Sequence, residues 1–145
     1  MDTPCQVDFY VLARPGQSAE KLACRLAMKA WHSGHRVLVQ TRDEAQAAAL
    51  DEMMWDEPPG RFLPHSNGAG SAKAPVSIQA QPGTGADGSD LLINLTAEPV
   101  AEPQQFRRLL EIVPAEAQQR AASRLKFKAY RDLGLEPVTH TIGKN

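Results

Sequence analysis

The sequence predicts an α/β protein with three layers, in which helices pack on both faces of a mainly parallel sheet. Two observations carry this prediction. Between residues 7 and 60, strand-like and helix-like segments alternate with short connections, which is the order of βαβ units. Some strand-like segments are nearly continuous apolar runs, which is typical of parallel strands that are covered on both faces. The 145 residues, of which 42% are hydrophobic, fit a single domain, 1–145.

The first strand and helix are predicted between residues 7 and 34. VDFYVL (7–12) is rich in the β-branched and aromatic residues that favour strands. Ser18 is placed to cap a helix that runs to about His32. Gly34 is expected to end this helix, because glycine tolerates the left-handed conformation found after helix C-termini.

A second strand and helix follow at once. RVLVQ (36–40) is a short apolar run, the pattern of a buried parallel strand. Asp43 and Gln46 have the spacing of a capping box for the helix DEAQAAALDEMMW (43–55). The Pro-Pro-Gly sequence at 58–60 is expected to end that helix.

The C-terminal half is predicted to contain three strands and two helices. PVSIQA (75–80) and DLLINL (90–95) are typical strands, and the second is apolar enough for a central position. Pro103 suits the first turn of a helix that we expect over 103–113. Pro114 begins the last and longest helix, which Gly134 ends. PVTHTI (137–142) is expected to be an edge strand, where proline is tolerated.

Two segments predict mobile loops, 64–74 and 81–89, because both are rich in Gly, Ser, Ala and Pro. The second contains GTGADG (83–88), which matches the G-x-G-x-x-G pattern of dinucleotide sites. In such sites the glycines lead into a helix whose N-terminus binds the pyrophosphate. Here a strand follows, so the sequence favours a flexible connection and no bound cofactor.

The composition bears on location and on broad class. Formal net charge is -1, so no global field attracts the protein to nucleic acid or a membrane. The segment 1–16 lacks a signal-peptide pattern, and no apolar run approaches about 18 residues, so we expect no membrane segment. Cys5 and Cys24 form no C-x-x-C motif, which favours a reducing compartment, the cytoplasm.

Signals for catalysis or metal binding are weak. The histidines are scattered at His32, His35, His65 and His140, which disfavours a zinc site. His65 is a candidate catalytic base, although a loop histidine more often bonds a nearby backbone carbonyl. A small nucleotide-dependent α/β enzyme that uses His65 or the 83–88 loop is the enzymatic alternative.

The most unusual segment is RLKFKAYR (124–131), which holds four cations and two aromatic rings without an acid. Residues 120–131 carry five positive charges in all, at Arg120, Arg124, Lys126, Lys128 and Arg131. The rest of the chain has 11 cations against 17 anions, a net -6. A basic segment on an acidic body suggests a localised anionic partner.

Helical spacing gathers most of these side chains on one face. On a helix over 115–133, four cations and one ring are separated by 3, 4 or 7 positions. We name these residues the cationic strip: Arg120, Arg124, Phe127, Lys128 and Arg131. Leu125, Ala129 and Leu133 lie on another face, which we expect to pack on the sheet. The basic residues are therefore expected in solvent and not beside a buried acid.

The cationic strip suits two kinds of anionic partner. Like charges four residues apart repel, and an exposed Phe among them is unusual without a contact to make, which favours a binding function. Single-stranded nucleic acid would use cations for phosphates and rings for stacking. An acidic peptide with a free C-terminus would use cations for carboxylates and the ring for an apolar side chain. The shortness of the strip favours a compact anion.

Six segments together resemble the chi subunits of bacterial DNA polymerase III, which belong to the clamp-loader assembly. They are SGHRVLVQ (33–40), LDEMMW (50–55), FLPH (62–65), APVSI (74–78), DLLINL (90–95) and RLKFKAYRDLG (124–134). The resemblance implies a non-catalytic domain with a sheet like that of nucleotide-binding folds but no nucleotide. It also implies roles in DNA replication and repair, with DNA contacted only indirectly.

The resemblance further implies which residues bind partners. Chi subunits bind the acidic C-terminal tail of single-stranded DNA-binding protein, which ends in an aromatic residue and its carboxylate. The matching positions are Val113, Arg120, Arg124, Phe127, Lys128 and Arg131. Chi subunits also bind the psi subunit, and in some bacteria a repair helicase, at positions that match Trp55 and Phe62. Sequence alone leaves open whether these two rings are exposed or in the core.

The leading hypothesis is therefore an adaptor that binds an acidic tail and catalyses no reaction. Direct recognition of single-stranded nucleic acid by the cationic strip is the alternative within the binding class.

Overall fold

The computed structural model describes residues 5–14, 16–55, 65–67, 76–80, 89–100 and 103–142. The strands are β1 (Gln6–Leu12), β2 (Val37–Gln40), β3 (His65–Asn67), β4 (Val76–Gln79), β5 (Leu91–Asn94), β6 (Arg108–Val113) and β7 (Val138–Ile142). The helices are α1 (Ala19–His32), α2 (Glu44–Met53) and α3 (Ala117–Asp132), with a short 3-10 helix at Pro103–Gln105.

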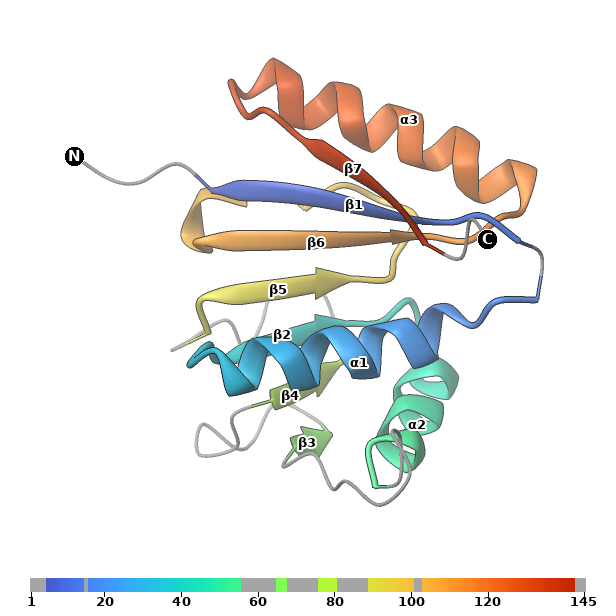
Figure 1. Ribbon diagram of the computed structural model, residues 1–145, viewed down its shortest axis with the longest axis vertical. Helices are drawn as coiled ribbons and strands as arrows, with labels where there is room; N and C mark the ends of the chain where they lie inside the picture. Colours follow the sequence, from blue (N-terminus) through green and yellow to red (C-terminus); the bar gives the residue numbers. More distant parts are fainter. Residues whose placement is uncertain are drawn as a thin grey trace.

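The strands form one seven-stranded sheet in the order β3-β4-β2-β5-β6-β1-β7 (Figure 1). Every pairing in it is parallel, so the predicted α/β class is confirmed. The predicted edge strand is present as β7, which pairs with β1 at one end of the sheet.

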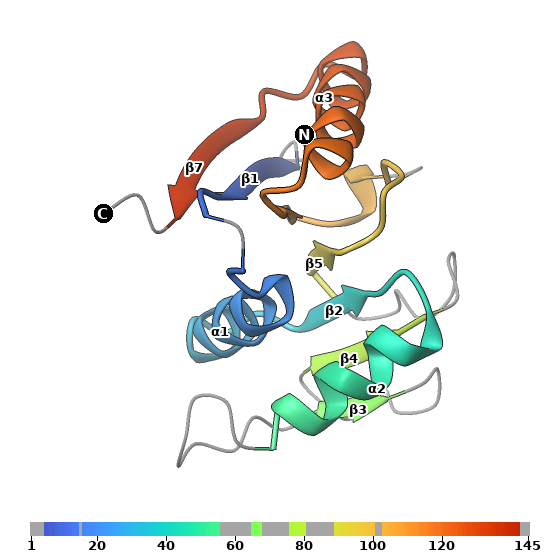
Figure 2. The same ribbon diagram turned by 90° about the vertical axis from the view of Figure 1, so that its right-hand side faces the viewer.

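The helices cover the two faces of the sheet, which gives the predicted three layers. α1 and α2 lie on one face and α3 lies on the other (Figures 1 and 2). This division follows from right-handed crossovers between parallel strands. The crossovers through α1 (β1 to β2) and α2 (β2 to β3) run towards the β3 edge of the sheet, whereas the crossover through α3 (β6 to β7) runs towards the β7 edge.

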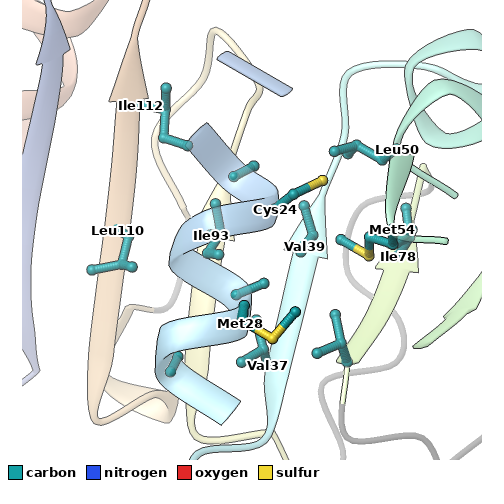
Figure 3. Packing of buried hydrophobic residues seen from close by; sticks show 14 of the residues in the cluster. Cys24, Met28, Val37, Val39, Leu50, Met54, Ile78, Ile93, Leu110 and Ile112 are labelled. Carbon is teal, nitrogen blue, oxygen red and sulfur yellow. The ribbon is translucent and has the colours of Figure 1, made fainter. Parts of the chain in front are cut away.

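Each face has its own apolar core. On the first face, Cys24 and Met28 of α1 and Leu50 of α2 pack over buried residues such as Val39 and Ile93 (Figure 3). On the second face, buried strand residues pack with α3 and the segment before β6. Because both faces of the central strands are covered, these strands need apolar residues at consecutive positions.

The predicted helix ends at Ser18, Gly34, Asp43 and Gly134 are confirmed. The last helix begins at Ala117 and not at Pro114, and the Pro-Pro-Gly sequence at 58–60 lies outside the described residues. The Ser18 hydroxyl accepts a hydrogen bond from the Lys21 backbone N–H at 3.1 Å, and an Asp43 carboxylate oxygen accepts one from the Gln46 N–H at 2.7 Å. Gly34 has a φ of 91°, the left-handed conformation expected after α1.

The predicted helix over 103–113 is wrong. Only Pro103–Gln105 is helical, as a single 3-10 turn, and the chain then forms β6 in the middle of the sheet. Leu109 packs on the α3 side and Leu110 on the α1 side, so both faces of this strand are apolar. Glu111, in the middle of the strand, hides this pattern in the sequence.

The predicted loop 64–74 is interrupted by a strand. Residues 65–67 form β3, which pairs with β4. The remainder of 64–74 lies outside the described residues, and so do all but the last residue of 81–89.

The face of α3 that packs on the sheet differs from the prediction. Leu125 is 71% exposed and Leu133 is 49% exposed, whereas Lys126 and Tyr130 are buried. Lys126 therefore does not belong with the solvent-exposed cations, and it does neutralise a buried acid, Glu111 of β6.

A buried polar network centred on Glu111 holds α3 on the sheet. The Lys126 ammonium and the Tyr130 hydroxyl donate to its carboxylate at 2.8 Å and 2.6 Å. The Asn94 amide donates to it at 2.9 Å, and Lys126 also donates to the Thr96 carbonyl. Burial raises the pKa of the Glu111 carboxyl, while the ammonium and the donated hydrogen bonds oppose that rise.

A second polar contact joins the start of two neighbouring strands. Asp90, just before β5, accepts a hydrogen bond from the Arg36 backbone N–H at 2.7 Å and contacts the His35 ring at 2.8 Å. Partial burial acts to raise the pKa of Asp90, but the bonds from His35 and Arg36 outweigh it and lower the pKa below its usual value.

We predict that Lys126→Met lowers the free energy of unfolding by about 3–5 kcal/mol, because it leaves Glu111 buried without its counter-ion. Urea denaturation measures this change. Lys128→Met, two residues away and exposed, is the control and should change stability by less than about 0.5 kcal/mol. Adding Glu111→Gln to Lys126→Met should recover part of the loss. Equal stability of the two single variants would contradict the structural role of Lys126.

We also predict a specific pH dependence for Asp90. Because its pKa is lower in the folded state, its stabilising contribution is complete above the usual Asp value of about 3.9 and is lost as pH falls below it. Asp90→Asn should therefore flatten the acid limb of a plot of stability against pH. Wild-type and variant curves that remain parallel below pH ~4 would contradict this assignment.

Candidate functional site

The four cations of the cationic strip lie in solvent on α3, as the sequence predicts: Arg120, Arg124, Lys128 and Arg131. Among the residues that the structure describes, none of these four forms an ion pair. Four like charges on one helix without acidic partners make a surface that favours anions.

Phe127 lies at the boundary between the strip and the core. Its ring is half-buried, and its centroid lies 5.4 Å from that of Phe9 on β1, with the ring planes tilted by 51°. The centroid of the Phe9 ring also lies 6.1 Å from the centroid of the Tyr130 ring. The sequence predicts a more exposed ring, but the structure anchors one edge of it in the core. Phe127 therefore offers a fixed apolar surface beside the cations.

Val113 approaches the same region from the sheet. It ends β6, is buried, and belongs to the apolar cluster against which Phe127 packs. Its partner on the neighbouring strand β1 is Val11, which is half-buried and packs against this cluster. Sequence reasoning missed Val11, because its contribution depends on the strand order and not on any local motif.

Trp55 lies on a different side of the molecule from the strip. It follows α2 and is 62% exposed, which answers the question that the sequence left open for this ring. α2 covers the face of the sheet opposite α3 (Figure 2). Phe62 lies outside the described residues.

The residues proposed for the enzymatic alternative receive no support from the described part of the chain. The side chain of His65 and the loop 83–88 lie outside it. His140 contacts buried Asp8 at 2.9 Å, and the described residues contain no cluster of three or more metal-ligating side chains. Burial raises the pKa of the Cys5 thiol to about 11, so this thiol is a poor nucleophile at neutral pH.

Within the ranges that the structure describes, none of the helices combines the length and the apolar character needed to cross a bilayer.

These observations define a three-layer α/β protein with a parallel sheet and one exposed cationic helix. The model of the family described as DNA polymerase III chi subunit, HolC, matches residues 5–138, and the chain belongs to this family. The predicted resemblance to chi subunits is thereby confirmed.

Curated relatives agree with this family. The chain is 40% identical over 138 residues to the DNA polymerase III subunit chi of Pseudomonas aeruginosa, covering 94% of this chain and 96% of the relative. It is 36% identical over 141 residues to the subunit of the same name from Escherichia coli, covering 92% of this chain and 95% of that relative. The Haemophilus influenzae subunit is 32% identical, covering 93% and 96%.

A solved structure shares the fold without close sequence similarity. It is the C-terminal domain of Saccharomyces cerevisiae Dbp5, solved bound to Gle1 and IP6, with a TM-score of 0.61 and 9% identity over 97% of this chain and 92% of that one. At such low identity the likeness concerns the fold alone.

Family membership establishes a role in DNA replication as an accessory subunit of DNA polymerase III.

Proposed function

We propose that the protein is a non-catalytic adaptor that binds the acidic C-terminal tail of single-stranded DNA-binding protein through the cationic strip. It would thereby link the clamp loader to coated single-stranded DNA in the cytoplasm. One observation carries the proposal: four exposed cations without acidic partners among the described residues lie on the same helix as the half-buried ring of Phe127, to one side of it.

The chemistry of such a tail matches the strip. Arginine guanidinium groups suit carboxylates because they present paired N–H donors in a rigid plane. Arg120, Arg124 and Arg131 supply three such groups. The terminal aromatic side chain of the tail would pack against the exposed part of Phe127 near Val11, while Val113 supports that surface from below.

The expected affinity is moderate. Exposed ion pairs contribute about 0.2–1 kcal/mol each. One buried aromatic side chain adds roughly 1.5–3 kcal/mol before the cost of ordering the peptide. For the four cations and one ring these contributions sum to at most about 7 kcal/mol, which corresponds to a dissociation constant of roughly 10 micromolar at the tightest. Binding should weaken as salt screens the charges.

We further propose that Trp55, together with Phe62, forms a second surface for the psi subunit or a repair helicase. Its support is the 62% exposure of the Trp55 side chain. Exposed tryptophans are uncommon on monomers and are frequent at the centre of protein interfaces. Since α2 and α3 cover opposite faces of the sheet, this surface and the strip would not compete for space.

We predict that Arg124→Ala weakens binding of a peptide with several acidic residues and a C-terminal Phe by up to about fivefold, the size of one exposed charge contact. Lys128→Glu replaces attraction by repulsion and should weaken binding by about tenfold, roughly 1.4 kcal/mol. Both side chains are exposed, so the melting temperature should stay near that of the wild type. Isothermal titration calorimetry measures the affinity. Lys29→Glu is the matched control, because Lys29 is an exposed lysine on α1, on the other face of the sheet.

Two results would contradict the proposal. One is wild-type affinity in the Lys128→Glu variant. The other is an equal loss in the Lys29→Glu variant, which would indicate non-specific attraction to net charge. A parallel titration with a single-stranded oligonucleotide tests direct nucleic-acid binding, and tight binding there would favour that alternative.

A further inference from the structure

A second concentration of positive charge lies in the segment that forms α1 and the start of the sheet. Residues 21–42 contain five cations and no acid. The five are Lys21, Arg25, Lys29, Arg36 and Arg42. Residues 120–131 contain another five, so the 16 cations of the chain leave only six for the remaining residues, against all 17 anions. Positive charge is therefore concentrated in two segments, and the proposed function uses only one of them.

Helical spacing places four basic side chains on the outer face of α1. Lys21, Arg25, Lys29 and His32 follow one another at spacings of 4, 4 and 3, so they lie within roughly 80° of each other around the helix axis. All four are exposed. The row that they form extends for about 16 Å along the helix. We name these four residues the α1 row.

The two lysines of the α1 row are not neutralised by their acidic neighbours in the sequence. The Glu20 carboxylate accepts a hydrogen bond from the Gln46 side chain on α2 at 2.9 Å, and Asp43 caps α2. As far as the structure describes the chain, neither Lys21 nor Lys29 has an ion-pair partner. Positive charges four residues apart repel, so an anionic partner would stabilise the row.

The shape of the α1 row suits the backbone of a single strand of nucleic acid. Cations about 6 Å apart along one line can each contact a separate phosphate. At the C-terminal end of the row, the centroid of the His32 ring lies 5.1 Å from that of Trp31, and the exposed His32 ring offers a surface for a base to stack on. The role of the family in DNA replication makes single-stranded DNA the natural partner of such a row.

Other anionic partners fit the α1 row less well. An acidic peptide would need an apolar contact beside its charges, as Phe127 provides in the cationic strip, whereas the four residues of the row are all basic. A helix that binds a membrane buries its apolar face in lipid. The apolar face of α1 instead packs in the core through residues such as Cys24 and Met28 (Figure 3).

We propose that the α1 row binds the backbone of single-stranded DNA directly, through phosphate contacts from Lys21 and Lys29 with Arg25 between them. This contact differs from the indirect one that the resemblance to chi subunits implies. Because α1 and α3 lie on opposite faces of the sheet (Figure 2), DNA and the acidic peptide could be bound at the same time. The inference goes beyond the proposed function and does not depend on it.

The salt dependence of oligonucleotide binding tests the phosphate contacts. Fluorescence anisotropy with a labelled oligothymidylate should give a dissociation constant of roughly 100 micromolar at about 50 mM salt, and binding should weaken as salt rises. Each phosphate contact contributes roughly 0.7 to the slope of log affinity against log salt for a single strand. Lys21→Gln and Lys29→Gln should each lower that slope by about 0.7 and weaken binding by up to about fivefold.

One variant should gain affinity. His32→Arg places a permanent charge in line with the lysines and keeps a planar group beside Trp31, so binding should strengthen about threefold. A gain of affinity cannot result from misfolding. Arg107→Gln is the matched control for net charge, because Arg107 is exposed and lies outside both cationic segments. It should change affinity by less than about twofold, since salt screens distant charges.

The outcomes separate the α1 row from its alternatives. If Arg124→Gln and Lys128→Gln weaken oligonucleotide binding and the Lys21 and Lys29 variants do not, the cationic strip binds nucleic acid and the row is wrong. If polyglutamate binds as tightly as the oligonucleotide and is lost in the same α1 variants, the row binds acidic protein and the inference fails. A wild-type protein that does not bind the oligonucleotide at about 50 mM salt would also overturn it.

The acidic peptide ending in Phe tests the proposed function separately. Calorimetry should show that Lys21→Gln and Lys29→Gln bind this peptide like the wild type, because they lie on the other face of the sheet from the cationic strip. Loss of peptide binding in the strip variants alone, with loss of oligonucleotide binding in the α1 variants alone, is the result that both proposals expect.

Discussion

The buried contact between Lys126 of α3 and Glu111 of β6 determines how the rest of the candidate site is arranged. Tyr130, one turn further along, donates to the same carboxylate, so two adjacent turns of the helix are tied to one strand residue. A buried charge pair is strongly directional, since each group must be satisfied by a partner of the right geometry. This contact fixes the face that α3 presents to solvent, which is where the cationic strip lies.

Most of the fold could be predicted from local sequence patterns. Ser18 and Asp43 cap their helices as their spacing indicates, and the apolar segments at 36–40 and 90–95 become central strands. β6 could not be predicted in the same way. Glu111 breaks its apolar run, and the reason for an acid there is a lysine 15 residues away that only the folded structure brings close.

The candidate site was predictable in part for the same reason. The exposure of Arg120, Arg124, Lys128 and Arg131 follows from helical spacing within one segment. Spacing could not separate Lys126 from these residues, because lysines are rarely buried unless paired and its partner lies on another element. The position of Val11 beside Val113 depends on the order of strands in the sheet, which no local motif encodes.

The way α3 is held also limits how its length could change in evolution. Inserting one residue between Arg124 and Lys126 would rotate the preceding turns by roughly 100° relative to the buried Lys126–Glu111 pair. Arg120 and Arg124 would then no longer lie beside Phe127. An insertion of seven residues, close to two full turns, would nearly preserve their direction. The helix could therefore lengthen only in steps that match its own repeat.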